Sequence, residues 1–251
     1  MKCPAAPRRR CVCIAGLAAL GFGSARAADL AGSSGHVTGS GNMVSQSRSP
    51  GSFQAIELRG SMKLVLRQSG REAVQVRADD NLLALIDTVV VRREEGGVLR
   101  IDSHGNWSTR RDIVVSVDLL TLKRLAISGS GDALADGLKL GSLQASLSGS
   151  GNLVLRQLAA DALVAELSGS GDLQASGRAA RLQLSMSGSG DVQAAALDAD
   201  EVRVGIAGSG NASVNARKTL SVDISGSGDV AYSGEALVKS SVSGSGSVHK
   251  R

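Results

Sequence analysis

A short glycine-rich motif that recurs at nearly constant spacing constrains the fold of this chain more than any other feature. The motif is Ser-Gly-Ser-Gly followed by Asp or Asn, and it occupies residues 128–132, 148–152, 168–172, 187–191 and 225–229, with variants at 207–211 and 243–247. Counted from the first glycine, successive copies lie 20, 20, 19, 20, 18 and 18 residues apart. A flexible linker has no such period. The spacing therefore predicts a repeat protein.

The residues between the motifs alternate between apolar and polar. Before one turn, for example, Leu182, Leu184 and Met186 are separated by polar residues. Alternation with a period of two predicts a strand with one buried face. A second short run, such as residues 192–194, follows each turn. Each repeat is therefore predicted to be a strand, a tight turn, a second strand and an irregular corner.

Two short strands cannot bury enough apolar surface alone, so the repeats have to stack. We therefore predict an all-β fold, a β-solenoid with about 18–20 residues and two main strands per rung in the C-terminal half. Small inward residues such as Ala145 and Ala165 suit a narrow core. Glycine suits turns that require a positive φ. The turn glycines are Gly129, Gly131, Gly149, Gly151, Gly169, Gly171, Gly188, Gly190, Gly208, Gly210, Gly226, Gly228, Gly244 and Gly246.

Residues 1–27 have the pattern of a secretory signal peptide. A basic start precedes an apolar run, and Ala25-Arg26-Ala27 is typical of a cleavage site. This segment holds five of the 28 basic residues, none of the 23 acidic ones and all three cysteines, so its removal leaves a neutral, cysteine-free chain. We expect an exported protein, periplasmic or extracellular, with no transmembrane segment after the signal because no later apolar stretch reaches about 18 residues.

The composition after residue 27 excludes several functions. A neutral chain lacks the basic surface that nucleic-acid binding requires. Without cysteine there is no disulfide framework and no cysteine-based metal site, and nothing in the sequence predicts a cofactor. The aromatic residues that remain are Phe53, Trp107 and Tyr232, too few for base-stacking platforms.

The chain before the regular repeat is less periodic but still rich in strand patterns. We assign residues 28–46 to a flexible N-terminal segment, 47–127 to irregular β-rungs, and 128–251 to the regular solenoid that continues from them. Residues 81–86 fit either one helical turn or a bulge.

Several segments together resemble a known bacterial family. They are Gly51-Ser52-Phe53-Gln54-Ala55-Ile56, the run from Val74 to Leu82, Leu99-Arg100-Ile101 and the serial turns. This pattern is similar to the head GIN domain family (DUF2807), described as putative autotransporter-adhesin heads, and it spans about residue 43 to the C-terminus. The resemblance implies a right-handed β-helix-like fold similar to pectin lyases, and an adhesive role without an established catalytic set.

The Asp or Asn after each turn is one candidate chemical feature. Stacking would align Asp132, Asp172, Asp191 and Asp229 with Asn152 and Asn211 in one column. One interpretation is a calcium ladder, since Ca²⁺ takes carboxylate and carbonyl oxygens. We favour the other, in which these side chains accept hydrogen bonds from turn amides, because one carboxylate per rung supplies few ligands.

The segment from His104 to Arg111 is the other candidate. It places Trp107, Arg110 and Arg111 beside His104 in a turn-rich region. As a binding loop it would meet a glycan or an anionic partner. We favour the alternative, a loop at the rim whose indole covers the end of the core.

For function, we expect a non-enzymatic solenoid that presents an interaction surface to an unknown surface or envelope ligand such as a glycan. The alternatives are a polysaccharide-active enzyme on the same scaffold, with exposed residues such as Glu166 and Asp223 at its cleft, and a purely structural envelope protein. The last rung is followed by no capping helix. Its strand edge is therefore either paired in a homo-oligomer or protected by Lys250 and Arg251.

Overall fold

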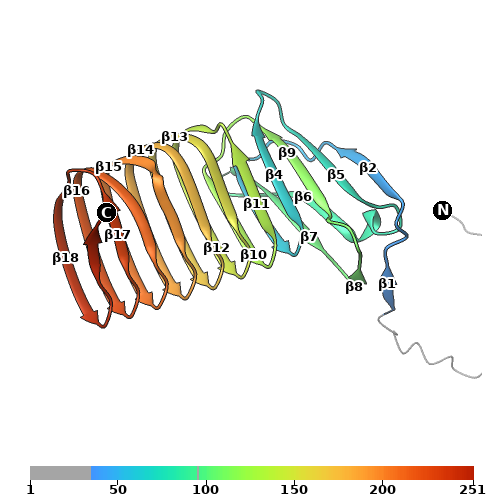
Figure 1. Ribbon diagram of the computed structural model, residues 1–251. Helices are drawn as coiled ribbons and strands as arrows, with labels where there is room; N and C mark the ends of the chain where they lie inside the picture. The colour runs from blue at the N-terminus through green and yellow to red at the C-terminus, as the bar shows by residue number, and fades with distance from the viewer. Residues whose placement is uncertain (1–34, 95) are drawn as a thin grey trace, which may run out of the picture. The chain divides into compact units, whose positions relative to one another are not determined.

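The computed structural model describes residues 35–94 and 96–251, so the predicted signal peptide lies outside the described residues. Within these residues the alternating sequence forms strands β1 to β19 and a single 3₁₀ turn, η1 (Leu83–Leu85) (Figure 1). The turn falls where the sequence allowed one helical turn. Seventeen of these strands share one hydrogen-bonded sheet, and β1 (His36–Thr38) pairs separately with β8 (Asn106–Ser108).

The regular repeat consists of long strands that bend. These are β13 (Leu153–Gly169), β14 (Leu173–Gly188), β15 (Val192–Gly208) and β16 (Ala212–Gly226). Each runs from one glycine turn to the next, so the two strands expected in a rung are continuous through the corner. Neighbouring rungs pair in parallel, with Leu163 opposite Leu182 and Gly169 opposite Gly188. The predicted all-β solenoid is thus confirmed.

Each rung contributes to two faces. The before-turn face contains the strand halves that lead into the glycine turns: β7 (Gly96–Ser103), β3 (Ala55–Gly60), β10 (Arg124–Gly129), β12 (Lys139–Gly149), β13 to β16 and β18 (Leu237–Gly244). The after-turn face contains the halves that follow them: β9 (Val114–Leu119), β4 (Lys63–Gln68), β11 (Asp132–Asp136), β13 to β16, β17 (Val230–Ser233) and β19 (Val248–Lys250).

The N-terminal rungs do not follow the order of the chain. The rung of β3 and β4 lies between the rung of β7 and β9 and the rung of β10 and β11. Three strands at this end are antiparallel: β6 (Ile86–Arg93) on β7, β5 (Ala73–Asp79) on β9, and β2 (Met43–Arg48) on β5. Residues 36–38 and 43–46, which the sequence assigned to a flexible segment, therefore lie in strands β1 and β2.

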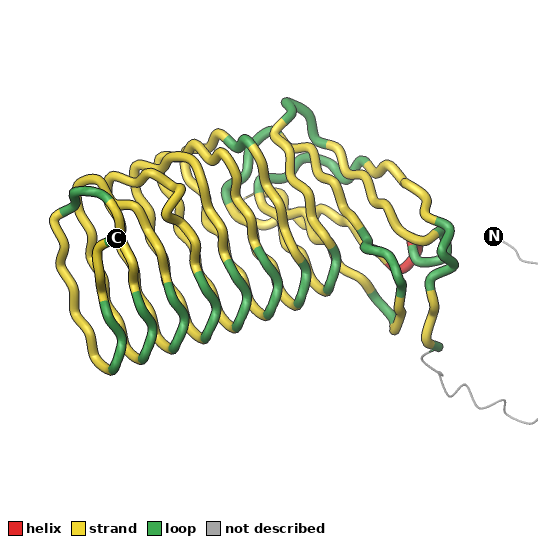
Figure 2. Tube along the Cα trace, in the orientation of Figure 1, coloured by secondary structure: helices red, strands yellow, loops and turns green. Residues whose placement is uncertain are grey.

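The turns are the constant part of the repeat, and they form a row along one edge of the stack (Figure 2). Each turn is hydrogen-bonded to the one before it: the Ser189 amide donates to Gly169 O at 2.9 Å and the Ser209 amide to Gly188 O at 3.0 Å. Differences in repeat length are absorbed at the corners. For example, the register shifts between Leu155 and Leu158, where Gln157 adopts a φ of 51°.

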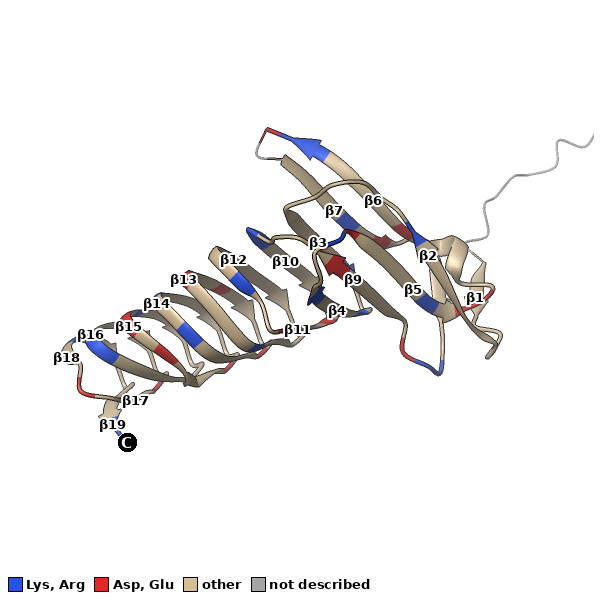
Figure 3. Ribbon diagram, turned by 90° about the horizontal axis from the view of Figure 1, so that it is seen from above, with Lys and Arg blue, Asp and Glu red and all other residues tan. Residues whose placement is uncertain are grey.

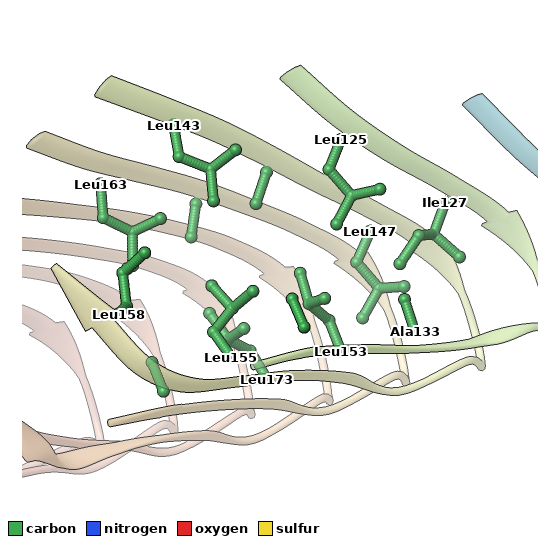
Figure 4. Packing of buried hydrophobic residues seen from close by; sticks show 14 of the residues in the cluster. Leu125, Ile127, Ala133, Leu143, Leu147, Leu153, Leu155, Leu158, Leu163 and Leu173 are labelled. Carbon is green, nitrogen blue, oxygen red and sulfur yellow. The ribbon is translucent and has the colours of Figure 1, made fainter. Parts of the chain in front are cut away.

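The core fills the narrow space between the two faces. Leucine side chains from both faces point toward one another there, as Figure 4 shows for Leu125, Leu143 and Leu153. Between Leu125 and Ile224, the side chains that the alternation predicts to point inward are at most 7% exposed. Leu140, at 9%, is slightly more exposed. The last rung differs, because Val238 and Val242 on β18 are 40% and 43% exposed. No further rung of the described chain covers them.

Candidate functional site

A polar groove crosses the after-turn face of the C-terminal rungs, from β14 to β19. Its volume is about 630 Å³. Its lining includes the side chains of Gln174, Asp191, Gln193, Asn211, Asp229 and His249. The polar residues occupy two positions of the repeat: the Asp or Asn directly after each turn and the residue two places later. These two positions point to the same side of a strand.

One column of the groove consists of the residues in the middle of each after-turn strand. Gln174 lies opposite Gln193, which lies opposite Ser213; Ala231 and His249 continue the column. In a parallel sheet these positions repeat at about 4.8 Å. Gln174, Gln193 and His249 are exposed, whereas Ala231 is buried. The column therefore offers side chains that can both donate and accept hydrogen bonds.

The second column is the row of Asp and Asn residues, which form a ladder between rungs. The amide of Asp191 donates to Asp172 Oδ1 at 2.9 Å, and that of Asn211 donates to Asp191 Oδ1 at 3.0 Å. The amide of Asp229 donates to Asn211 Oδ1 at 3.1 Å. Each side chain thus accepts from the backbone of the next rung, rather than from its own turn. The ladder holds the groove residues of neighbouring rungs in register.

Ser247 is the last residue of the ladder. The Ser247 amide donates to Asp229 Oδ1 at 2.8 Å, and its hydroxyl donates to the same oxygen at 2.7 Å. These bonds, that of the hydroxyl first, lower the pKa of Asp229 below its usual 3.8. Asp229 is therefore an anion at neutral pH and serves the groove as an acceptor.

The geometry of the ladder can be compared with what a calcium ladder requires. One oxygen of each carboxylate, the Oδ1 atom of Asp132, Asp172 and Asp191, already accepts a backbone amide of the next rung. Within residues 35–94 and 96–251, no three His, Cys, Asp or Glu side chains gather as a metal site requires. The column is thus arranged for hydrogen bonds between rungs.

The segment from His104 to Arg111 lies outside the groove. Trp107 lies on β8 opposite Val37 and is half-buried against the core. His104 Nδ1 lies 3.2 Å from Asp87 Oδ2, while Arg110 and Arg111 are exposed. The structure does not bring these four side chains together with the groove.

Sequence reasoning identified one column of the groove and missed the other. Gln174, Gln193 and His249 were not predicted as site residues, because a single polar residue at an outward position is common in a strand. The available signal was positional: each lies at the same step after its turn. In Figure 3 basic and acidic segments are interspersed along the solenoid, which agrees with the neutral composition.

Fold and groove together define a class: a β-solenoid scaffold whose stacked rungs present a repetitive polar surface. The family model described as "Putative auto-transporter adhesin, head GIN domain" matches residues 52–236. The chain belongs to this family, as the sequence resemblance predicted.

Solved structures share the fold. A "putative adhesin" from Bacteroides fragilis has a TM-score of 0.77 at 22% identity, covering 86% of this chain and 100% of that one. A "putative lipid binding protein" from Parabacteroides distasonis has a TM-score of 0.68 at 25% identity, with coverage of 86% and 100%. A "putative adhesin" from Parabacteroides merdae has a TM-score of 0.68 at 23% identity, with coverage of 86% and 99%. No curated protein matched the chain.

Proposed function

We propose that this chain is an exported adhesin-like protein that binds an extended, hydroxyl-rich polymer, such as a surface or envelope glycan, along the polar groove. One observation carries the proposal: the Asp/Asn ladder repeats in every rung of the groove, and beside it a second column is polar at Gln174, Gln193, Ser213 and His249 and interrupted only at Ala231. Amides and carboxylates at a fixed period suit a ligand that repeats its own polar groups. The Asp and Asn side chains of the ladder, which hydrogen bonds already hold in place, also lose little entropy on binding.

Family membership supports the adhesive role and an exported or surface location. Among the described residues, no helix is long and apolar enough to cross a membrane. We place the protein in the periplasm or outside the cell, where an envelope glycan is accessible.

Two observations favour binding over catalysis. Glu166 and Asp223, the carboxylates suggested for a cleft, are three rungs apart. That separation is about 14 Å at the spacing of strands, beyond the roughly 9.5 Å that spans the carboxyl pair of glycosidases. In the groove, the lowered pKa of Asp229 makes it a poor general acid at neutral pH.

The test is a glycan array followed by calorimetry on the best ligand. The double variant Gln174→Ala/Gln193→Ala should weaken binding at least about tenfold, because each lost hydrogen bond contributes about 1 kcal/mol. The matched control is Gln144→Ala/Gln183→Ala, which removes two glutamines from the before-turn face and should bind like wild type. Equal losses in both variants would place the ligand elsewhere. Absence of any glycan binding, with whole-cell binding also absent, would favour the purely structural role.

A second candidate is an apolar ligand on the before-turn face. A hollow of about 630 Å³ lies over β12 to β16, and Leu147, Leu167 and Met186 contribute to its lining. Serines such as Ser168 and Ser187 line it as well, together with the carboxylates Glu166 and Asp223. The similar structure described as a "putative lipid binding protein" favours this use. Flotation with phosphatidylcholine vesicles would test it. Co-flotation that Ser168→Glu/Ser187→Glu abolishes is the expected result, and no co-flotation would remove this candidate.

A further inference from the structure

We propose that the polar groove selects a β-1,4-linked chain of glucose-type sugars that carries no acidic groups, and that this chain runs along the solenoid axis with one sugar per rung. The proposal rests on the function proposed above, and it adds a linkage, a direction and a charge class to the ligand.

The groove is longer across the rungs than along a strand. Its lining comes from the successive, parallel-paired strands β14, β15, β16, β17 and β19, and two positions of the repeat supply most of its polar side chains. Five rungs span about 19 Å, whereas two positions on the same side of one strand lie about 7 Å apart. A single polymer chain is therefore accommodated along the solenoid axis rather than across it.

The spacing of the rungs favours one kind of linkage. Rungs repeat at about 4.8 Å, and an extended β-1,4-linked chain of glucose-type sugars advances by a similar length per sugar. Adjacent sugars of such a chain are turned over, so each column faces different hydroxyls in alternate rungs. Gln174 and Gln193, which lie in neighbouring rungs, tolerate this change because an amide both donates and accepts. An α-1,4-linked glucose chain coils instead, and it loses register with the rungs.

Hydroxyl contacts have to supply the recognition. In the described part of the chain no Phe, Tyr or Trp lines the groove, so the faces of the sugars find no ring on which to stack. Glucose-type sugars hold their hydroxyls equatorial, pointing sideways from the chain. The ladder uses Oδ1 of Asp191 and of Asp229, which leaves Oδ2 of each side chain as an acceptor for such a hydroxyl.

The charge of the groove disfavours an acidic polymer. Asp191 and Asp229 both line it, and Asp229 is an anion at neutral pH because hydrogen bonds from Ser247 lower its pKa. A β-1,4-linked chain of glucuronate would bring a carboxylate to each rung, including the rungs of these two residues. Like charges at such short distances repel. A chain without acidic groups avoids this repulsion.

Calorimetry with matched hexasaccharides tests the linkage and the charge class. Cellohexaose and chitohexaose are β-1,4-linked and free of acidic groups, maltohexaose is the α-1,4-linked chain of the same glucose, and hexaglucuronate keeps the β-1,4 linkage but carries a carboxylate on each sugar. We expect cellohexaose or chitohexaose to bind at least about tenfold more tightly than both comparators. Equal or tighter binding of maltohexaose or hexaglucuronate would overturn the proposal.

A series of chain lengths tests the direction. Along the solenoid axis each added sugar reaches a further rung, so the tetrasaccharide should bind at least about tenfold more tightly than the disaccharide. A chain lying across the groove gains little after the second sugar. An affinity that stops rising at the disaccharide would therefore contradict binding along the axis.

The variant Asp191→Asn/Asp229→Asn tests the part that the carboxylates play. Each new Asn keeps an Oδ1 acceptor for the ladder, as Asn211 does, so the fold is retained, and a thermal melt checks this. The variant should gain at least about fivefold in affinity for hexaglucuronate. The matched control, Asp161→Asn/Glu201→Gln, removes two exposed carboxylates outside the groove. An equal gain in the control would contradict repulsion within the groove.

The outcomes separate this proposal from the proposed function. Suppose that neither cellohexaose nor chitohexaose binds, while the ligand found on the glycan array loses affinity in Gln174→Ala/Gln193→Ala. The linkage and charge class are then wrong, and the groove remains a glycan site. If no glycan binds at all, both proposals are wrong.

Discussion

At the scale of the residue, the turn glycines serve two needs at once. Gly188 has a φ of 130°, a region that side chains with a Cβ rarely adopt, and a Cβ there would lie 2.2 Å from Gly169 O. The neighbouring rung is backbone, which cannot rotate away. The period of the motif therefore reflects both the shape of one turn and the close approach of the next.

Gly188→Ala should therefore lower the free energy of unfolding by at least about 2 kcal/mol, from backbone strain and forced displacement of the neighbouring rung. Denaturant unfolding measures this. Gly205→Ala is the matched control, because the nearest atom to a Cβ there is 3.9 Å away and its φ is not positive. It should be neutral or slightly stabilising. Equal effects of the two substitutions would refute the account of the turn.

Single carboxylates set the response to acid. The pKa of Asp229 lies below 3.8 because of hydrogen bonds from Ser247, and that of Asp200 lies below 3.8 chiefly because of a hydrogen bond from Lys218. A carboxyl whose pKa is lower in the folded than in the unfolded state stabilises the fold above the unfolded pKa. That contribution is lost as pH falls through the folded pKa.

The melting temperature should thus be steady near neutral pH and fall below about pH 4. Asp229→Asn keeps an Oδ1 acceptor, as Asn211 does in the previous rung, and cannot titrate in this range. Its melting temperature should fall less steeply on acidification than that of wild type. Identical slopes for the two proteins would show that Asp229 does not contribute.

At the scale of the element, the ends of the stack need separate solutions. At the N-terminal end, antiparallel strands extend both faces of the stack, and the connection through η1 covers the end of the core, where Leu82 and Ile86 are buried. Arg48 joins the two faces there by hydrogen bonds to backbone carbonyls on the far side. Its planar group reaches two acceptors at once, which a lysine cannot do in the same way.

Arg48→Ala should lower the free energy of unfolding by about 1–2 kcal/mol through loss of these charge-assisted bonds. Hydrogen exchange should become faster in β2 and β6 while β14 and β15 stay protected. Arg77→Ala, an exposed position on the adjacent β5, is the control and should exchange like wild type. Uniformly faster exchange in all strands would contradict a role confined to the end.

The elements that the sequence predicted are those governed by local pattern. Alternation located the strands around Leu163 and Leu182, and the motif located every regular turn. The insertion of the β3–β4 rung between later strands was not predictable. The alternation of apolar and polar residues shows that a segment is a strand, but it does not show with which distant strand it pairs. The exposure of Val242 was not predicted for a related reason. Val242 and the buried Ile224 occupy the same position of the repeat, and they differ only in whether a neighbouring rung covers them.

At the scale of the whole molecule, stacking of the sequence repeats gives the solenoid two exposed faces, the before-turn face and the after-turn face. Its neutral, interspersed charge gives no electrostatic steering toward polyanions, so the proposed binding of a glycan relies on local hydrogen bonding. The Asp/Asn column could be read from the sequence, whereas the groove needed the register that aligns Gln174 with Gln193. The central claim is that this after-turn face carries the ligand.

Side-chain amide signals in two-dimensional NMR, recorded during titration with the ligand selected on the glycan array, test that claim most directly. The account predicts that the NH₂ signals of Gln174, Gln193 and Asn211 shift together. Those of Gln144 and Gln183, on the before-turn face, should remain in place. Shifts confined to Gln144 and Gln183 would contradict the account and move the binding face to the opposite side of the solenoid.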